Sequence, residues 1–182
     1  MIETVKGFRD VLMPESLKRR KVREIIEKNF KLFGFMPIET PTIEYEEVVK
    51  GSNENDEAVS ERFKLKDRGN RELALRYEFT FQLKRLFKEN QNIKLPFRRY
   101  QIGTVFRDEP IGKDRYREFI QCDADIIGDS SIKADADCLA LADKICKELG
   151  IKYELKINNR KLVNSILDKL DISDKANVLR EI

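Results

Sequence analysis

Apolar side chains recur at spacings of three and four residues in several stretches of the chain, and this spacing is typical of amphipathic helices. The first such stretch begins after Pro14, because proline suits the first turn of a helix, and it ends at Gly34. Ser173 is a candidate cap for one more helix near the end of the chain. The pattern predicts helices over residues 14–33, 80–90, 135–149 and 159–170.

Shorter stretches alternate apolar and polar residues, or are rich in aromatic and β-branched side chains, as strands are. Two of them flank the turn-forming residues 67–70, and two others flank the polar loop 108–114. Pro37 and Pro41 place the first strand at an edge or an interface, because proline has no N–H for a neighbouring strand. The polar segment 50–61 is predicted to be a mobile loop. The predicted strands are 35–43, 62–66, 72–76, 97–106, 117–127 and 151–157.

The order of these elements favours an α+β fold, an antiparallel β-sheet flanked by helices. Hairpins link the predicted strands, and the regular strand–helix alternation of a doubly wound parallel sheet is not present. A chain of 182 residues, 41% of them apolar, is long enough for one sizeable domain with a short appendage.

The composition excludes several kinds of active site. The sequence contains no histidine, which excludes a histidine general base, a catalytic triad and a histidine-ligated zinc. Its three cysteines lack a CxxC spacing, and with a polar N-terminus they indicate free thiols in a reducing compartment. We therefore expect a cytoplasmic protein with no membrane partner. Charged residues make up 38% of the chain at a net charge of +3, which permits nucleic-acid contact without arguing strongly for it.

The predicted hairpin 97–127 carries the strongest chemical signal. Arg107 ends its first strand and Arg115 begins its second, so the two guanidinium groups can face one ligand from opposite arms. Guanidinium forks bind phosphate oxygens and stay charged at any pH. Glu109, in the loop between them, can accept hydrogen bonds from an exocyclic amine. This pattern points to a nucleotide triphosphate site, and the alternative is a surface hairpin with ordinary charged residues.

A second candidate site follows on the same hairpin. Gln121, Asp123 and Asp125 alternate along one strand and therefore share one face of the sheet. Such a face would hold a cation, for example an amino acid's ammonium group, unless it is only solvated. Glu78 and Thr80 lie where a strand passes into a helix, and spacing alone favours an ordinary helix-terminal acid and a cap there.

Five blocks of the sequence, in this order and spacing, resemble the class II aminoacyl-tRNA synthetase core, and specifically histidyl-tRNA synthetase of the archaeal and eukaryotic type. LRYEFT at 75–80 resembles a signature of that family, and residues 14–45 resemble class II motif 1. FRDEP with RYREFIQCDADIIG resembles motif 2, at about 97–127. KGFRD at 6–10 and KINNRKLVNSILDKLDIS at 156–173 resemble the opening and following blocks.

The resemblance implies roles for the ATP site. Arg107 would be the catalytic cation on the α-phosphate of ATP, Glu109 would lie near the adenine, and Arg115 would lie near the γ-phosphate. Mg2+ is expected to accompany ATP, with no metal held by the protein itself.

The resemblance also implies a histidine site. Glu78, Thr80 and Gln121 would hold the α-amino group, Arg107 the carboxylate, and Asp125 would face the imidazole. The implied reaction is that of a histidine–tRNA ligase, which forms histidyl-adenylate and transfers histidine to tRNA(His). Motif 1 implies a homodimer.

Members of this family continue with an RGLDYY-type block, motif 3 and an anticodon-binding domain, and none of these is present in the sequence. Residues 1–182 therefore resemble the N-terminal portion of a catalytic domain, cut from a longer chain or part of a split enzyme. We expect weak or absent activity of this portion alone. The alternatives are a non-catalytic, synthetase-like, histidine-binding regulatory protein and, less favoured, a nucleic-acid-binding module that uses only its basic residues.

Overall fold

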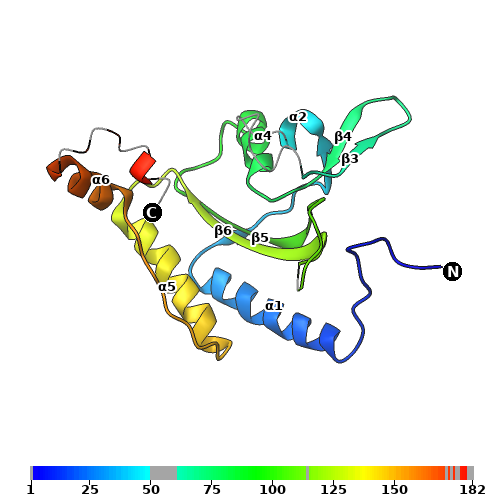
Figure 1. The fold of residues 1–182 in the computed structure, drawn as a ribbon, viewed down its shortest axis with the longest axis horizontal. Coiled ribbons are helices and arrows are strands. Elements are labelled where there is room, and N and C mark those ends of the chain that lie inside the picture. Colours follow the sequence, from blue (N-terminus) through cyan, green and yellow to red (C-terminus); the bar gives the residue numbers. More distant parts are fainter. Residues whose placement is uncertain are drawn as a thin grey trace. The chain divides into compact units, whose positions relative to one another are not determined.

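The computed structural model describes residues 2–49, 61–113, 115–170, 172, 174 and 177–179. The chain forms two compact units, Met1–Ile151 and Lys152–Ile182, and each is described by itself. The first unit carries both described sheets and most of the described helices (Figure 1). The second contains one described helix of more than one turn, α6 (Arg160–Lys169).

A long antiparallel ribbon forms the centre of the first unit. Strands β5 (Phe97–Phe106) and β6 (Glu118–Ile127) pair along all ten residues of each strand. The short strand β1 (Met36–Pro37) pairs in parallel with β5, so the strand order is β1-β5-β6. The predicted strand at 35–43 is therefore wrong in extent, because only two of its residues join this sheet. Pro37 does lie on an edge strand among the described residues, as its missing N–H requires.

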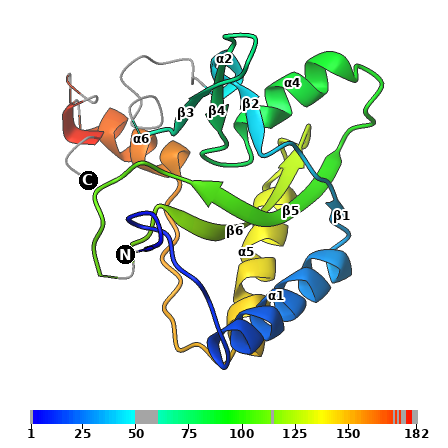
Figure 2. The same cartoon turned by 90° about the vertical axis from the view of Figure 1, so that its right-hand side faces the viewer.

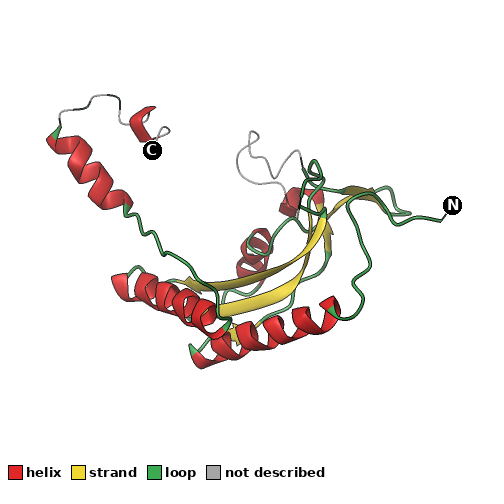
Figure 3. Ribbon diagram, turned by 60° about the horizontal axis from the view of Figure 1, so that its bottom comes forward, coloured by secondary structure: helices red, strands yellow, loops and turns green. Residues whose placement is uncertain are grey.

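One face of the ribbon packs against two helices and forms the main core. Helices α1 (Glu15–Leu32) and α5 (Ile132–Glu148) lie side by side on this face (Figures 2 and 3). The rings of Phe30 on α1 and Tyr100 on β5 lie 5.2 Å apart, measured between their centroids. Every second residue of both strands points here, because side chains alternate along a strand. The partly buried members from the ribbon are Ile102, Cys122, Ala124 and Ile126.

A small second sheet lies on the other side of the ribbon, with two helices (Figure 2). Its strands are β2 (Ile43–Tyr45), β4 (Glu72–Leu75) and β3 (Lys64–Lys66), all antiparallel. Helices α2 (Glu46–Val49) and α4 (Phe81–Glu89) accompany them. A separate apolar cluster, formed by Val49, Ala74, Tyr77 and Phe81, joins these elements.

The connection between the two sheets runs through Arg76. Its carbonyl accepts from the N–H of Phe106 at 3.0 Å, and its own N–H donates to the carbonyl of Thr42 at 3.0 Å. The residues that follow Arg76 therefore run beside the end of β5. This brings Glu78 next to the face of the ribbon that is turned away from α1 and α5.

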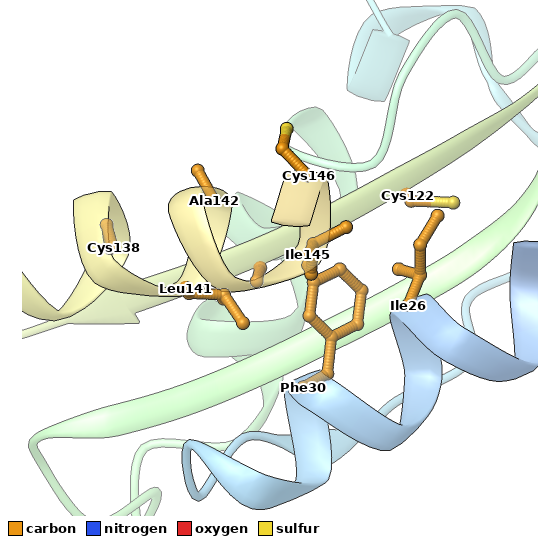
Figure 4. Close-up of a pocket in the computed structure, with 9 residues that line it drawn as sticks. Ile26, Phe30, Cys122, Cys138, Leu141, Ala142, Ile145 and Cys146 are labelled. Carbon is orange, nitrogen blue, oxygen red and sulfur yellow. The ribbon is translucent and has the colours of Figure 1, made fainter. Parts of the chain in front are cut away.

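An apolar hollow of about 320 Å³ lies between α1, α5 and β6 (Figure 4). All three cysteines line it, together with Phe30, Leu141 and other apolar residues. Burial raises the pKa of the Cys122 and Cys138 thiols, so these groups stay protonated at neutral pH. The three cysteines are free thiols, as their spacing predicted. The hollow has no charged lining residue and does not fit an anionic or zwitterionic ligand.

The helices predicted in the first unit are confirmed within three residues at each end. The strand predicted at 151–157 is wrong, because these residues pair with no strand in the described part of the chain. The four-residue helix α2 was not predicted. The loop predicted at 50–61 and the cap at Ser173 lie outside the described residues, apart from Glu61.

In the second unit, Asn159 caps helix α6. Its side-chain oxygen accepts from the N–H of Lys161 at 2.9 Å and from that of Leu162 at 3.3 Å. The helix predicted at 159–170 is confirmed. Across both units, no described helix combines the length and the apolar character that a membrane span requires.

Candidate functional site

The two arms of the hairpin bring Arg107 and Arg115 to the same carboxylate. Arg115 donates through its Nε to Glu109, and Arg107 Nη1 lies 3.7 Å from Glu109 Oε1. The Glu109 side chain is only 6% exposed, whereas that of Arg115 is 65% exposed. The guanidinium groups therefore lie on the same side of the hairpin. An anion can reach Arg115 directly from solvent, and it can reach the partly exposed Arg107 beside Glu109.

Aromatic rings hold Arg107 in place. Its guanidinium carbon lies 4.3 Å from the ring centroid of Tyr77 and 5.1 Å from that of Phe119. Cation–π contacts of this kind fix a guanidinium without using its N–H donors. The Nε of Arg107 is buried and has no hydrogen-bond partner among the described residues. Arg107 is therefore held by the two rings, and its side chain stays 28% exposed, so that a ligand can reach it.

Arg117 braces the loop between the arms. Its Nε donates to the carbonyl of Glu109 at 3.0 Å, and its Nη2 lies 3.1 Å from Asp108 Oδ1. The N-terminal block packs against it, because the N–H of Arg117 donates to the carbonyl of Gly7 at 2.9 Å. Gly7 has a φ of +89°, and a Cβ there would lie 2.8 Å from carbons of Arg117. Only glycine fits this close approach.

The ribbon face opposite the core is polar, and we call it the polar face. Gln121, Asp123 and Asp125 share it, as their alternation predicted, and Cys122, Ala124 and Ile126 face the helices. Across the ladder, Arg99 lies opposite Asp125, Gln101 opposite Asp123, and Gly103 opposite Gln121.

Hydrogen bonds order this face. Gln121 Nε2 donates to Asp123 Oδ2 at 2.9 Å, and Gln101 Nε2 donates to Thr40 Oγ1 at 3.0 Å. Arg99 is completely buried and forms an ion pair with Asp125. The polar face is thus built as an ordered set of partners and does not resemble a solvated sheet surface.

Glu78 connects the polar face with the hairpin arginines. Burial raises the pKa of Glu78, and the negative charge of Asp123 raises it further, while Thr80 and Arg107 lower it. Thr80 occupies the cap position of α4 but makes no side-chain capping bond, and its hydroxyl bonds to Glu78 instead. The expectation that Thr80 is an ordinary cap is therefore wrong. Burial also raises the pKa of Asp125, and Arg99 opposes that shift.

Sequence reasoning missed several residues that shape this site. Arg76 is buried and donates to the carbonyls of Thr104 at 2.6 Å and Thr40 at 3.0 Å. It lies over Gly103, where a Cβ would come within 3.0 Å of Arg76 Nη2. Arg99 was also missed, although a correct strand register would have placed it opposite Asp125. In the part of the chain that the structure describes, no three acidic or thiol side chains are arranged to hold a metal.

The comparisons with known proteins agree with this geometry. The family model described as histidyl-tRNA synthetase matches residues 7–182. The chain is 42% identical over 172 residues to histidine–tRNA ligase 1 of Bacillus cereus, covering 94% of this chain and 40% of that protein. It is 40% identical over 180 residues to histidine–tRNA ligase of Wolinella succinogenes, covering 97% of this chain and 40% of the relative.

Solved structures show the same likeness. Histidyl-tRNA synthetase from Nostoc sp. superposes with a TM-score of 0.79 at 29% identity, over 95% of this chain and 40% of that one. A Bacillus halodurans protein described as an ATP phosphoribosyltransferase regulatory subunit/histidyl-tRNA synthetase gives a TM-score of 0.80 at 27% identity. That match covers 100% of this chain and 47% of the other.

These relatives are bacterial, so they do not support the archaeal and eukaryotic type predicted from the sequence. The chain spans about two fifths of the length of the curated relatives. The fold is that of a partial class II catalytic core, and the match extends over nearly all of the chain. The chain therefore belongs to the histidyl-tRNA synthetase family.

Proposed function

We propose that the chain forms the ATP- and histidine-binding part of a histidine–tRNA ligase. The reaction joins histidine to the α-phosphate of ATP, releases pyrophosphate, and then passes histidine from the adenylate to tRNA(His). One observation carries the proposal: Arg107 and Arg115 converge on Glu109, beside Glu78 and the polar face with Gln121 and Asp125.

The hairpin arginines suit the ATP side of the reaction. Arg107, fixed between two rings, would stabilise negative charge on the α-phosphate as the substrate carboxylate attacks and pyrophosphate leaves. Arg115 is exposed and would bind the γ-phosphate. A phosphate competing for the two arginines would free the Glu109 carboxylate, which can then accept a hydrogen bond from the adenine amine.

The polar face suits the amino acid. Glu78, with Thr80 and Gln121, would hold the α-ammonium group, and Arg107 would also contact the α-carboxylate. Asp125 would accept from the imidazole ring. The fixed position of Arg107 between Glu78 and Glu109 would bring the histidine carboxylate and the α-phosphate to one cation.

Magnesium enters this proposal only as a companion of the ATP phosphates. The two carboxylates nearest the arginines are already engaged, Glu109 by Arg115 and Asp108 by Arg117. They do not form a ready metal site. The homodimer, the cytoplasmic location and the archaeal and eukaryotic type stay predictions. Sedimentation of the chain at several concentrations checks the first.

A binding and exchange experiment tests the proposal. The chain should bind histidine and ATP, and should catalyse histidine-dependent exchange of pyrophosphate into ATP only weakly, as expected of this portion alone. Arg107→Ala should weaken both ligands and abolish the exchange. Arg98→Ala is the matched control, because Arg98 lies on β5, the strand that leads to Arg107, but pairs with Asp137 of α5 at 2.9 Å. ATP binding that does not depend on Arg107 would contradict the proposal.

A non-catalytic regulatory protein that binds histidine is the second candidate. The Bacillus halodurans structure, whose description includes an ATP phosphoribosyltransferase regulatory subunit, supports keeping it. Such a protein needs the polar face but has no need for Arg115 as a γ-phosphate ligand. Histidine binding without ATP binding would favour this candidate over the ligase.

A further inference from the structure

Arg99 is the most deeply buried charged group on the polar face. Its side chain is 0% exposed, and its guanidinium forms an ion pair with Asp125 on the neighbouring strand. Apart from this ion pair, its three nitrogens have no hydrogen-bond partner among the described residues. A buried guanidinium with unused donors is costly unless the site contains a further partner, such as a ligand or an ordered water.

The charges around Arg99 are unequally distributed. Asp125 lies directly opposite it, and Asp123 and Glu78 also stabilise its positive charge. Asp123 lies on the same strand as Asp125 and disfavours a second negative charge there. Cys138 of α5 also senses the charge of Asp125. Asp125 is therefore the carboxylate with its own cation, whereas Asp123 accepts from Gln121 and Glu78 interacts with the charge of Arg107.

We propose that Arg99 is a positioning residue that keeps Asp125 ionised and oriented, so that the pair forms a seat of no net charge for an uncharged imidazole ring. This inference rests on the proposed function and specifies the protonation state of its amino-acid substrate. An ionised Asp125 can only accept, so it selects a ring N–H. The neighbouring guanidinium repels a cation, so the imidazolium form is rejected.

Burial and the ion pair with Arg99 act on the pKa of Asp125 in opposite directions. Burial raises the pKa of this carboxyl, and the Arg99 charge lowers it. Arginine stays protonated throughout the relevant range, because its intrinsic pKa lies far above neutrality. Removal of Arg99 would therefore favour a neutral carboxyl that donates a proton, or an unpaired anion that attracts imidazolium. Either state would change which form of histidine binds.

Calorimetric titration with two ligands at pH 7.5 and 5.5 tests this directly. Histidine becomes mostly imidazolium at the lower pH, since its side-chain pKa is about 6.5, whereas 1,2,4-triazolylalanine keeps an uncharged ring. The unaltered chain should lose about tenfold more affinity for histidine than for the triazole between the two pH values. Titration of Glu78 and Asp125 affects both ligands and cancels in this ratio.

Variants at neighbouring positions separate positioning from general stability. Arg99→Met should weaken histidine binding at pH 7.5 about tenfold or more and remove or reverse the pH dependence of the ratio. Arg99→Lys should restore that dependence, since it restores the charge. Arg98→Met should leave the ratio unchanged, because Arg98 serves the opposite face of the same strand. A folded Arg99→Met chain with the original ratio at both pH values would overturn the inference.

A measurement without ligand keeps the two proposals apart. The carboxyl carbon of Asp125, followed by NMR, should titrate at a higher pH in Arg99→Met than in the unaltered chain. If the unaltered chain binds no histidine, the proposed function and the ring preference both fall, and this titration still decides whether Arg99 holds Asp125 ionised. Should Arg99→Met fail to fold, the ligand ratios of the unaltered chain and Arg99→Lys decide, and a ratio independent of pH in both refutes the inference.

Discussion

The guanidinium carbon of Arg107 lies 4.3 Å from the ring centroid of Tyr77, and this contact links the LRYEFT segment to the hairpin. Tyr77→Leu should therefore release Arg107 and weaken ATP binding about three- to thirtyfold, the range expected for a partly buried cation–π contact. Tyr77→Phe keeps the ring and loses only the hydroxyl bond to Glu61 at 3.3 Å, so it should bind ATP nearly as well. Equal losses in both variants, measured by calorimetry, would assign the effect to the hydroxyl.

Replacement of Arg115 should weaken the binding of ATP and leave the binding of histidine nearly unchanged. Arg115→Ala removes the exposed arm of the arginine pair, and we expect ATP affinity to fall about tenfold or more, as for a charged hydrogen bond. Histidine affinity should stay within about twofold, because Arg115 contacts Glu109 and does not lie on the polar face. Lys113→Ala in the same loop is the control for charge alone. Parallel losses of both ligands would argue that Arg115 maintains the fold.

Gly103 permits the buried approach of Arg76 to the ribbon. A Cβ at this position would lie 3.0 Å from Arg76 Nη2 and 3.4 Å from Phe79 Cζ. Gly103→Ala should lower the free energy of unfolding by about 1–3 kcal/mol, as overpacking does. Gly112→Ala, whose Cβ would meet its nearest neighbour at an ordinary 3.8 Å, should change it little. Urea denaturation compares the two, and equal stabilities would show that Arg76 can move aside.

Glu78 should make stability depend on pH in the opposite direction to a typical ion-paired acid. Because its pKa is raised in the folded chain, the unfolded chain releases this proton first, and the ionised group costs stability at higher pH. Glu78→Gln should therefore be more stable than the unaltered chain at pH 7 and equal to it near pH 4. It should also bind histidine more weakly. Urea denaturation at both pH values gives the sign, and a stability gain confined to pH 4 would contradict the argument.

The parts of the fold that follow from local periodicity were predictable. Helix α5 and the ribbon strands have strong patterns, and the alternation 121-123-125 predicted both faces of β6 without the register of its partner strand. Residues 151–157 alternate in the same way, yet no described strand pairs with them, since alternation supplies a face and no partner. The predicted strand 35–43 is divided into β1 and β2 because the two strands belong to different sheets. The local sequence does not show to which sheet a strand belongs.

The residues expected to contact the ligands could be predicted from the sequence. The residues that hold them in place could not. Arg107, Arg115 and Glu109 come together because one short loop joins them. Arg99 required the register of two strands, and Tyr77 required the path between the two sheets. Both are contacts between segments that are distant in the chain, so they emerge only from packing.

The division of β6 into a core face and a polar face has an evolutionary consequence. Neighbouring residues of β6 are under different selective pressures. Cys122 and Ala124 are selected for packing in the core, whereas Asp123 and Asp125 are selected for ligand binding on the polar face. In a library that samples all substitutions from 118 to 127, tolerance should oscillate with a period of two. Substitutions at the core-facing positions should lower solubility, and substitutions at the alternate, polar-face positions should lower ligand binding. A lineage can therefore change what this surface binds while its hydrophobic interior stays intact.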